Sequence, residues 1–299
     1  MKIGYIGLGK MGLAMVKRLL DHGHEVVATD PNEMARQEAL AAGAEIVENL
    51  SEFAETLPGE KFIWMMVPHN VVDQVLSDLS GILKPGDVIM DGGNSNYQET
   101  VRRGNELRQK GLVFMDVGTS GGPSGARNGA CMMIGGDHEK FQKYEQLFKD
   151  LSVENGYAYM GKTGAGHFVK MVHNGIEYGM MQAIGEGFEI LQKSPFDLDL
   201  AEVSRIYNNG SVIESRLVGW LEKAYREEGV ELSAISGEVS HSGEGLWTVE
   251  AAKNEGVPAP VIEASLQFRI NSTGNPSYTG QMVSALRNQF GGHSVKKKD

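Results

Sequence analysis

The sequence is poor in cysteine, in long apolar runs and in positive charge, and each shortage excludes a class of protein. Its single cysteine, Cys131, cannot form an internal disulfide, and its apolar neighbours in Ala130–Ile134 predict a buried, inert thiol. The longest uncharged apolar run, Phe62–Val67, is far shorter than the ~18 to 20 residues of a membrane helix. The net charge of -11 opposes general binding to phosphate backbones. We therefore expect no membrane partner and no nucleic-acid partner.

Glycine is abundant instead, at 39 of 299 residues. This is about 13%, against the ~7% of an average protein. A glycine pattern that begins at Gly7 leaves no room for a removable leader before it, which predicts a cytoplasmic protein. With 41% apolar residues, the chain has the composition of a globular protein of about two domains.

The first half of the chain alternates β-rich runs with amphipathic segments. The expected strands are Ile3–Ile6, Glu25–Thr29, Phe62–Val67, Val88–Asp91, Val113–Val117 and Cys131–Ile134. The expected helices are Met11–Asp21, Glu33–Ala41, Val71–Leu79, Tyr97–Gln109 and Glu139–Leu151. The alternation predicts an α/β fold over residues 1–164, a Rossmann-like, doubly wound parallel sheet. Long helical periods from His167 onward predict an all-α domain over 165–299.

A dinucleotide fingerprint follows the first predicted strand. It consists of Gly7, Leu8, Gly9, Lys10, Met11 and Gly12, and an apolar helix begins directly after it. Glycines there permit a tight turn and let pyrophosphate approach bare backbone at a helix N-terminus. Asp30, 18 residues after Gly12, is placed to accept hydrogen bonds from ribose hydroxyls and to repel a 2'-phosphate. The pattern predicts NAD, against the alternative of a glycine turn with a helix-capping Asp.

Three further loops come at predicted strand ends. They contain Val67, Pro68 and His69; Asn94, within Asp91–Ser95; and Ser120, Gly121 and Gly122. Each could be a turn with a capping side chain and nothing more. Because ligands of such sheets bind at the carboxyl ends of the strands, their joint position favours cofactor and substrate contacts.

A polar stripe marks the long helical segment. Lys170, His173, Asn174 and Glu177 fall at i, i+3, i+4 and i+7, so a helix places them on one face between apolar neighbours. The alternative is a solvated Lys–Glu pair beside a satisfied histidine. An amine and a carboxylate near a nicotinamide suggest a base and an acid, provided that burial or charge lowers the proton affinity of the lysine.

These residues resemble the 6-phosphogluconate dehydrogenase family, in its shorter NAD-preferring bacterial form, within the β-hydroxyacid dehydrogenase superfamily. The resemblance spans the chain and includes Ser242–Gly245, Trp247–Thr248, Arg287 and His293. It implies oxidative decarboxylation of 6-phospho-D-gluconate to D-ribulose 5-phosphate with reduction of NAD and without a metal. Lys170, Glu177 and Asn174 are then the catalytic residues. Lys170 acts first as base and later as acid, and Glu177 protonates C1.

The resemblance also implies the ligands of a phosphorylated sugar acid. Those of the carboxylate and hydroxyls are Asn94, Ser120, Gly121, Gly122, His173 and Asn174. Those of the sugar and phosphate are Tyr178, Thr248, Arg269, Arg287 and His293. The last two are expected from a partner subunit, in a homodimer or homotetramer with shared active sites.

One position departs from the family pattern. Leu246 stands where the family usually has a basic residue for the phosphate. An unphosphorylated sugar acid is therefore kept as an alternative substrate. A dehydrogenase of another β-hydroxy acid, such as 3-hydroxyisobutyrate, is a further alternative, in which Glu177, Arg287 and His293 would have no evident task. A non-catalytic NAD-binding sensor is an alternative of another class.

Overall fold

The computed structural model describes residues 1–240, 243–292 and 295. The chain forms two compact units, Met1–Met171 and Val172–Asp299. Helix α9 (Ala165–Gln192) begins in the first unit and continues into the second. Each unit is described by itself below.

The first unit contains one sheet of eight strands, in the order β3-β2-β1-β4-β5-β6-β7-β8. The strands are β1 (Lys2–Ile6), β2 (Glu25–Thr29), β3 (Glu45–Ile46), β4 (Phe62–Met65), β5 (Val88–Asp91), β6 (Val113–Ser120), β7 (Ala130–Gly135) and β8 (Ser152–Gly161). The helices are α1 (Lys10–Asp21), α2 (Glu33–Ala41), α3 (Leu50–Thr56), α4 (Val72–Ser80), α5 (Tyr97–Gln109), α6 (Gly122–Asn128), α7 (His138–Lys143) and α8 (Glu145–Leu151). This mostly parallel sheet confirms the predicted Rossmann-like fold.

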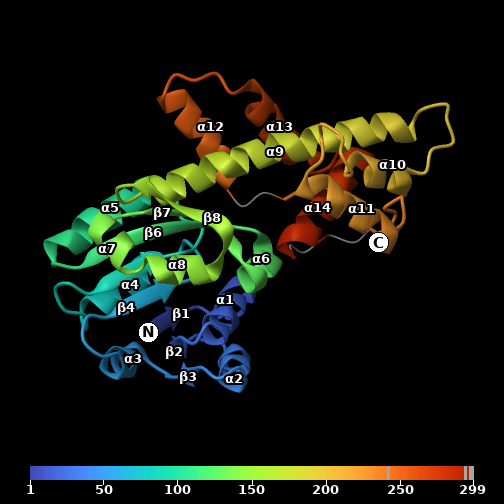
Figure 1. Ribbon diagram of the computed structural model, residues 1–299. Helices are drawn as coiled ribbons and strands as arrows, with labels where there is room; N and C mark the ends of the chain where they lie inside the picture. The colour runs from blue at the N-terminus through green and yellow to red at the C-terminus, as the bar shows by residue number, and fades with distance from the viewer. Residues whose placement is uncertain (241–242, 293–294, 296–299) are drawn as a thin grey trace. The chain divides into compact units, whose positions relative to one another are not determined.

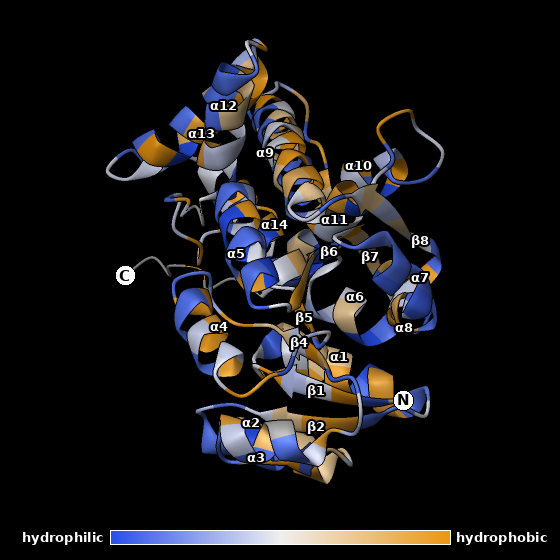
Figure 2. Cartoon of the chain, turned by 90° about the vertical axis from the view of Figure 1, so that its left-hand side faces the viewer, coloured by the Kyte–Doolittle hydropathy of each residue, from blue (hydrophilic) through white to orange (hydrophobic). Residues whose placement is uncertain are grey.

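Both faces of the sheet carry an apolar core. Met15 and Leu19 of α1 and Phe148 of α8 pack on one face. Phe53 of α3 and Leu79 of α4 pack on the other. Figure 2 shows α4 and α5 on the opposite side of the sheet from α1, α6 and α8. The continuously apolar runs of β4 and β5 follow from this burial on both faces.

Strand β7 differs from the prediction because it runs antiparallel to β6. Only residues 121–129 connect the two strands, whereas a parallel crossover needs about a dozen residues or more. The segment predicted as one helix over Glu139–Leu151 is instead α7 and α8, with Tyr144 between them.

The prediction of a buried Cys131 is wrong, because its side chain is exposed. Side chains alternate along a strand, and Cys131 lies on the opposite face from its buried neighbours Ala130 and Met132. It pairs with Ser120, the last residue of β6, so it lies at the end of the ladder. The apolar run is real, but its register exposes the thiol.

The second unit is helical, as predicted. It contains the later part of α9 with α10 (Leu200–Tyr207), α11 (Arg216–Glu228), α12 (Glu244–Asn254), α13 (Pro260–Ser272) and α14 (Tyr278–Gly291). Side chains of Asp199, Ser215 and Ser277 accept hydrogen bonds from N–H groups at the starts of α10, α11 and α14. Met181, Phe188, Leu221 and Leu286 belong to its core. Within the described residues, every helix is too short or too polar to cross a membrane.

Candidate functional site

The predicted dinucleotide loop connects β1 to α1 in a shape that only glycine permits. Gly7 has a φ of +97°, and a Cβ there would lie 2.3 Å from the Met66 carbonyl oxygen. A Cβ on Gly12 would lie 2.0 Å from the Gly7 carbonyl oxygen. Gly9 is different, since a Cβ there would meet no described atom within 4 Å. The outer glycines therefore shape the turn, and Gly9 leaves an open approach to the backbone.

The N-terminus of α1 fits an anionic ligand. Its N-cap, Gly9, offers no side chain to the first N–H groups, and the first turn has no acidic residue. Lys10 is exposed and Met11 is half-buried. Uncapped N–H groups and the positive end of the helix dipole attract a pyrophosphate. The observed loop thus has the donors and the free space that the fingerprint predicts.

Asp30 follows β2 and lies beside this loop. Its Oδ2 accepts a hydrogen bond from the Leu8 N–H at 2.6 Å, and its Oδ1 accepts one from the Asn32 N–H at 2.7 Å. A carboxylate has about four acceptor positions, so both oxygens can still accept ribose hydroxyls. The sequence prediction missed Arg36, whose Nη1 donates to the Asp30 carbonyl at 2.7 Å. The helical period of α2 was the signal, because it turns Arg36 back toward the end of β2.

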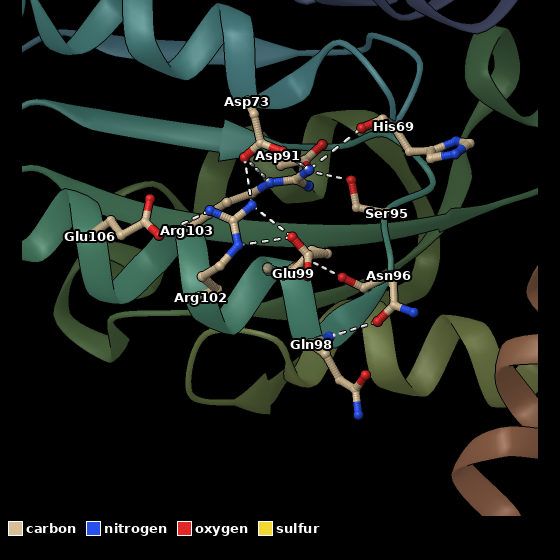
Figure 3. Close-up of polar contacts among 11 residues, drawn as sticks. His69, Asp73, Asp91, Ser95, Asn96, Gln98, Glu99, Arg102, Arg103 and Glu106 are labelled. Atoms are coloured by element: carbon tan, nitrogen blue, oxygen red, sulfur yellow. Dashed lines mark hydrogen bonds and ion pairs between the residues drawn. The ribbon is translucent and has the colours of Figure 1, made fainter.

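Ion pairs join α4 to α5 beside the loop that contains Val67, Pro68 and His69 (Figure 3). Arg103 is buried and donates to the Asp73 carboxylate at 2.9 and 2.8 Å, and to the His69 carbonyl at 3.5 Å. The hydrogen bond from Arg103 lowers the pKa of Asp73 well below its usual value, and Arg102 adds to the effect. His69 itself is exposed at the end of this anchored loop.

The loop after β5 is organised by Asp91. One carboxylate oxygen accepts the Gly93 N–H at 3.0 Å, and the other accepts the Ser95 hydroxyl at 2.7 Å (Figure 3). Asp91 is fully buried, whereas Asn94 between its two partners is exposed. The Asp therefore has a structural task, and the loop presents Asn94 at the carboxyl end of the sheet.

Strand β6 ends at the third loop and meets the start of α9. Gly121 and Gly122 have φ values of +126° and +62°, and both are half-buried, as is Ser120. A Cβ on Gly118 would lie 2.3 Å from the Cβ of Lys170. Lys170 therefore packs directly on β6, near the strand end at which the three predicted loops lie.

The polar stripe of α9 continues from Lys170 into the second unit. Asn174 is buried, with 9% exposure, while His173 and Glu177 are half-buried. The ring Nδ1 of His173 lies 2.9 Å from the Asn174 Oδ1 and 3.9 Å from the Glu177 Oε2. These three side chains form one connected group along the helix.

Tyr178 lies next along α9, within a cluster of buried cations. The Arg269 guanidinium carbon is 3.3 Å from the centroid of the Tyr178 ring. Arg269 is 2% exposed and Arg287 is 6% exposed. Burial lowers the pKa of Arg269 to about 10, and the nearby charge of Arg287 adds to this effect. Burial also lowers the pKa of Arg287 and raises that of Tyr178.

Two atoms of this cluster point to a ligand. The Tyr178 hydroxyl and the Arg269 Nη2 are buried and have no hydrogen-bond partner among the described residues. A buried polar atom without a partner costs about 1 to 3 kcal/mol, and more when it is charged. An anion between these donors would remove that cost.

Helix α12 packs against the same cluster. A Cβ on Gly245 would lie 2.4 Å from the Tyr178 ring, and one on Gly175 would lie 2.5 Å from the Thr248 methyl group. Leu246 is 39% exposed, whereas Glu244 is 5% exposed and interacts electrostatically with Tyr178 and Arg287. The prediction missed this buried carboxylate, although its place beside Gly243 and Gly245 was a signal.

The structure thus gathers the predicted residues into two groups, one in each unit. Arg287, expected from a partner subunit, already lies within electrostatic range of Tyr178 and Arg269 of its own chain. It also donates to the Ser240 hydroxyl at 2.8 Å. His293 and Ser242 lie outside the described residues.

Known proteins are similar to this chain over its whole length. The NAD binding domain of 6-phosphogluconate dehydrogenase matches residues 2–170, and the C-terminal domain of that enzyme matches residues 166–274 and 191–299. The provisionally assigned 6-phosphogluconate dehydrogenase YqeC of Bacillus subtilis (strain 168) is 51% identical over 298 residues, which is 100% of both chains.

Two further relatives extend the comparison. The NAD(+)-dependent, decarboxylating 6-phosphogluconate dehydrogenase of Haloferax volcanii is 42% identical over 301 residues, again 100% of both chains. The Plasmodium falciparum 6-phosphogluconate dehydrogenase shares the fold, with a TM-score of 0.79 and 24% identity over 96% of this chain and 70% of that chain. Residues 1–171 therefore contain an NAD-binding domain, and the chain belongs to the 6-phosphogluconate dehydrogenase family of oxidoreductases.

Proposed function

We propose that the protein oxidises and decarboxylates 6-phospho-D-gluconate to D-ribulose 5-phosphate and reduces NAD. The observation that carries the proposal lies in the second unit. Glu177, which belongs to the stripe that Lys170 begins, interacts electrostatically with the buried Arg269 and Arg287. An acid thus lies close to a cluster that favours an anion, as a phosphorylated hydroxy acid requires.

Lys170 begins the proposed reaction as general base. Its amine takes the proton from the C3 hydroxyl, and bound NAD would supply the acceptor for the hydride that leaves C3. The product is a β-keto acid, whose carboxylate leaves as CO₂ while Lys170 returns a proton to the developing enediolate oxygen. Glu177 then protonates the carbon that was C2 of the acid and that becomes C1 of ribulose 5-phosphate. His173 and Asn174, which contact each other at 2.9 Å, hold hydroxyl and carboxylate oxygens of the substrate.

The residues for the other groups follow from their chemistry. Gly7 to Gly12, with Asp30, bind the adenosine half of NAD. Val67, Pro68, His69 and Asn94 contact its other half. Ser120, Gly121 and Gly122 bind the substrate carboxylate. Tyr178, Thr248, Arg269, Arg287 and His293 bind the sugar phosphate.

A second substrate is favoured by specific side chains. Leu246 supplies no cation, and Glu244 places a buried carboxylate near Tyr178 and Arg287. Both features weaken the attraction of a phosphate dianion and would suit the terminal hydroxyl of gluconate. We still place the phosphorylated acid first, because the buried Arg269 Nη2 has no hydrogen-bond partner among the described residues and a phosphate would supply one.

The test compares 6-phosphogluconate with gluconate by the absorbance of NADH and by release of CO₂. We expect both signals with the phosphorylated acid, and a higher kcat/KM for it. NADH without CO₂ would indicate a simple dehydrogenase, and a better reaction with gluconate would exclude the phosphate assignment. NAD binding without turnover on either acid would favour the sensor.

The variant Lys170→Met tests the role of Lys170 as general base. We expect turnover to fall by about 10² to 10⁴-fold, the usual contribution of general acid–base catalysis, while NAD binding measured by titration stays intact. Near wild-type turnover would remove Lys170 from the mechanism.

The proposal includes a homodimer or homotetramer. Its support is the set of exposed apolar side chains on α9 and α13, among them Ile176, Met180, Val261 and Ile270. Light scattering of the purified protein measures the assembly. Mixing inactive Lys170 and Arg287 variants then tests whether sites are shared, because only shared sites regain activity in mixed oligomers.

A further inference from the structure

We propose that Asp116 is a positioning residue, which fixes the first turn of α9 on the sheet and so places the Lys170 amine. The inference rests on the proposed function only for the role of Lys170. Asp116 is fully buried in the middle of β6. Its Oδ1 accepts the Gly164 N–H at 2.7 Å, and its Oδ2 accepts the His167 N–H at 2.8 Å. The carboxylate therefore satisfies N–H groups that a helix start leaves without intrahelical partners.

Three glycines bring α9 into backbone contact with the sheet around this carboxylate. A Cβ on Gly166 would lie 2.3 Å from the Met133 carbonyl oxygen, and one on Gly135 would lie 2.7 Å from the Gly166 backbone nitrogen. A Cβ on Gly118 would lie 2.3 Å from the Lys170 Cβ. Since each clash is with backbone or with the base of a side chain, no flexible group can move aside. The helix start therefore has little freedom to shift.

The spacings on strand and helix match. Asp116 and Gly118 are two residues apart on β6, so their side-chain positions are on one face, about 6 to 7 Å apart. Their partners His167 and Lys170 are three residues apart, close to one helical turn. Asp116 fixes the helix along and around its axis, and Gly118 fixes its distance from the strand. Together these contacts determine where the Lys170 side chain begins.

Burying the Asp116 carboxylate costs free energy of desolvation, which an apolar side chain at this place would not cost. Burial raises the pKa of the Asp116 carboxyl, and His167 and the two backbone N–H groups only oppose that rise. His167 is 2% exposed, and its Nδ1 lies 2.8 Å from the Thr100 hydroxyl. Among the described residues, no arginine or lysine forms an ion pair with Asp116, so burying its carboxylate costs free energy. A need to hold the start of α9 in one position accounts for a carboxylate at this place.

The experiment uses Asp116→Asn in the full chain, with Asp87→Asn as the matched control. Asp87 is also buried, at 3%, and also accepts two backbone N–H groups, from Lys61 at 2.8 Å and Lys84 at 2.9 Å. It precedes β5, and its two partners belong to the segments before β4 and β5 rather than to α9. An amide cannot accept at both of its ends, so both variants lose comparable hydrogen bonding.

We expect Asp116→Asn to lower kcat per folded molecule by roughly ten- to a hundred-fold, with little change in the KM for NAD, because small misplacement of a catalytic group is that costly. Hydride transfer should become slower, so the deuterium isotope effect at C3 of the substrate should rise. Asp87→Asn should leave both quantities unchanged once the folded fraction is measured by circular dichroism. Equal losses of kcat in the two variants would overturn the inference.

A double variant separates positioning from general stability. In a Lys170→Met background, Asp116→Asn should cause no further loss, because the group that it positions is gone; a full additional loss would overturn the inference. If Lys170→Met itself keeps near wild-type activity, the proposed function fails, and this outcome can be told apart from failure of the Asp116 inference.

If Asp116→Asn does not fold, Gly118→Ala replaces it as the test variant. Gly187→Ala on α9 is then the control, since a Cβ on Gly187 meets no described atom within 4 Å. Unchanged kcat in Gly118→Ala would then overturn the inference.

Discussion

The two units bury charge in different ways. In the first unit, the buried acids Asp87, Asp91 and Asp116 each accept two hydrogen bonds, mostly from backbone N–H groups. In the second unit, Arg269 and Tyr178 bury polar atoms that have no hydrogen-bond partner among the described residues. Satisfied charges shape loops and helix starts, whereas unsatisfied ones are costly unless a ligand completes them. The first unit also buries atoms without a partner among the described residues, such as the Arg103 Nη1 and the His167 Nε2, but its buried acids are each held by two donors. In the second unit, the unpartnered donors of Tyr178 and Arg269 lie together in a cluster that fits an anion.

The largest expected effect that tests this contrast is that of Arg269→Met. Loss of a charged hydrogen bond to the substrate costs roughly 1.5 to 3 kcal/mol, so kcat/KM for 6-phosphogluconate should fall about ten- to a hundred-fold. The free energy of unfolding should stay the same or rise, because a buried cation with a pKa near 10 becomes an apolar side chain. Thermal unfolding measures it, and a clear loss of stability would contradict the contrast.

Asp73→Asn in the first unit should have the opposite effect on stability. It should lower the free energy of unfolding at neutral pH by about 1 to 2 kcal/mol, because the buried Arg103 loses its charged partner. The pKa of Asp73 is depressed in the folded protein, so its contribution is present above the unfolded pKa near 3.8 and is lost as pH falls below that value.

Denaturant titrations of wild type and Asp73→Asn at neutral and acidic pH measure this difference. The gap between the two proteins should narrow as the pH falls below about 4. A gap that is constant with pH would show that the ion pair does not stabilise the fold.

The smallest expected effect is that of Leu246→Lys in the second unit. Leu246 is 39% exposed, and a partly exposed ion pair contributes about 0.2 to 1 kcal/mol, so the KM for 6-phosphogluconate should fall at most about five-fold. The kinetics with gluconate serve as the control and should not improve. An equal gain with both acids would mean that the new charge does not meet a phosphate.

Much of the fold was predictable because local patterns carried it. The glycine fingerprint, the apolar strands and the stripe on α9 each depend on a short period, which a sequence displays directly. The antiparallel direction of β7 was also present in the sequence, but its only signal was the short length of the connection at 121–129. The face of Cys131 depended on register, since a shift by one residue along a strand reverses every side chain.

The sequence by itself determined the family, the cofactor fold and the candidates for acid–base chemistry, because these depend on residue types at fixed spacing. Only the tertiary structure decided which charges are satisfied. Asp116 meets the start of α9, and Arg103 meets the His69 loop, through contacts between residues 34 to 51 positions apart. Packing likewise brings Glu244 within electrostatic range of Arg287. Such contacts follow from packing, which brings distant residues together without leaving a period in the sequence.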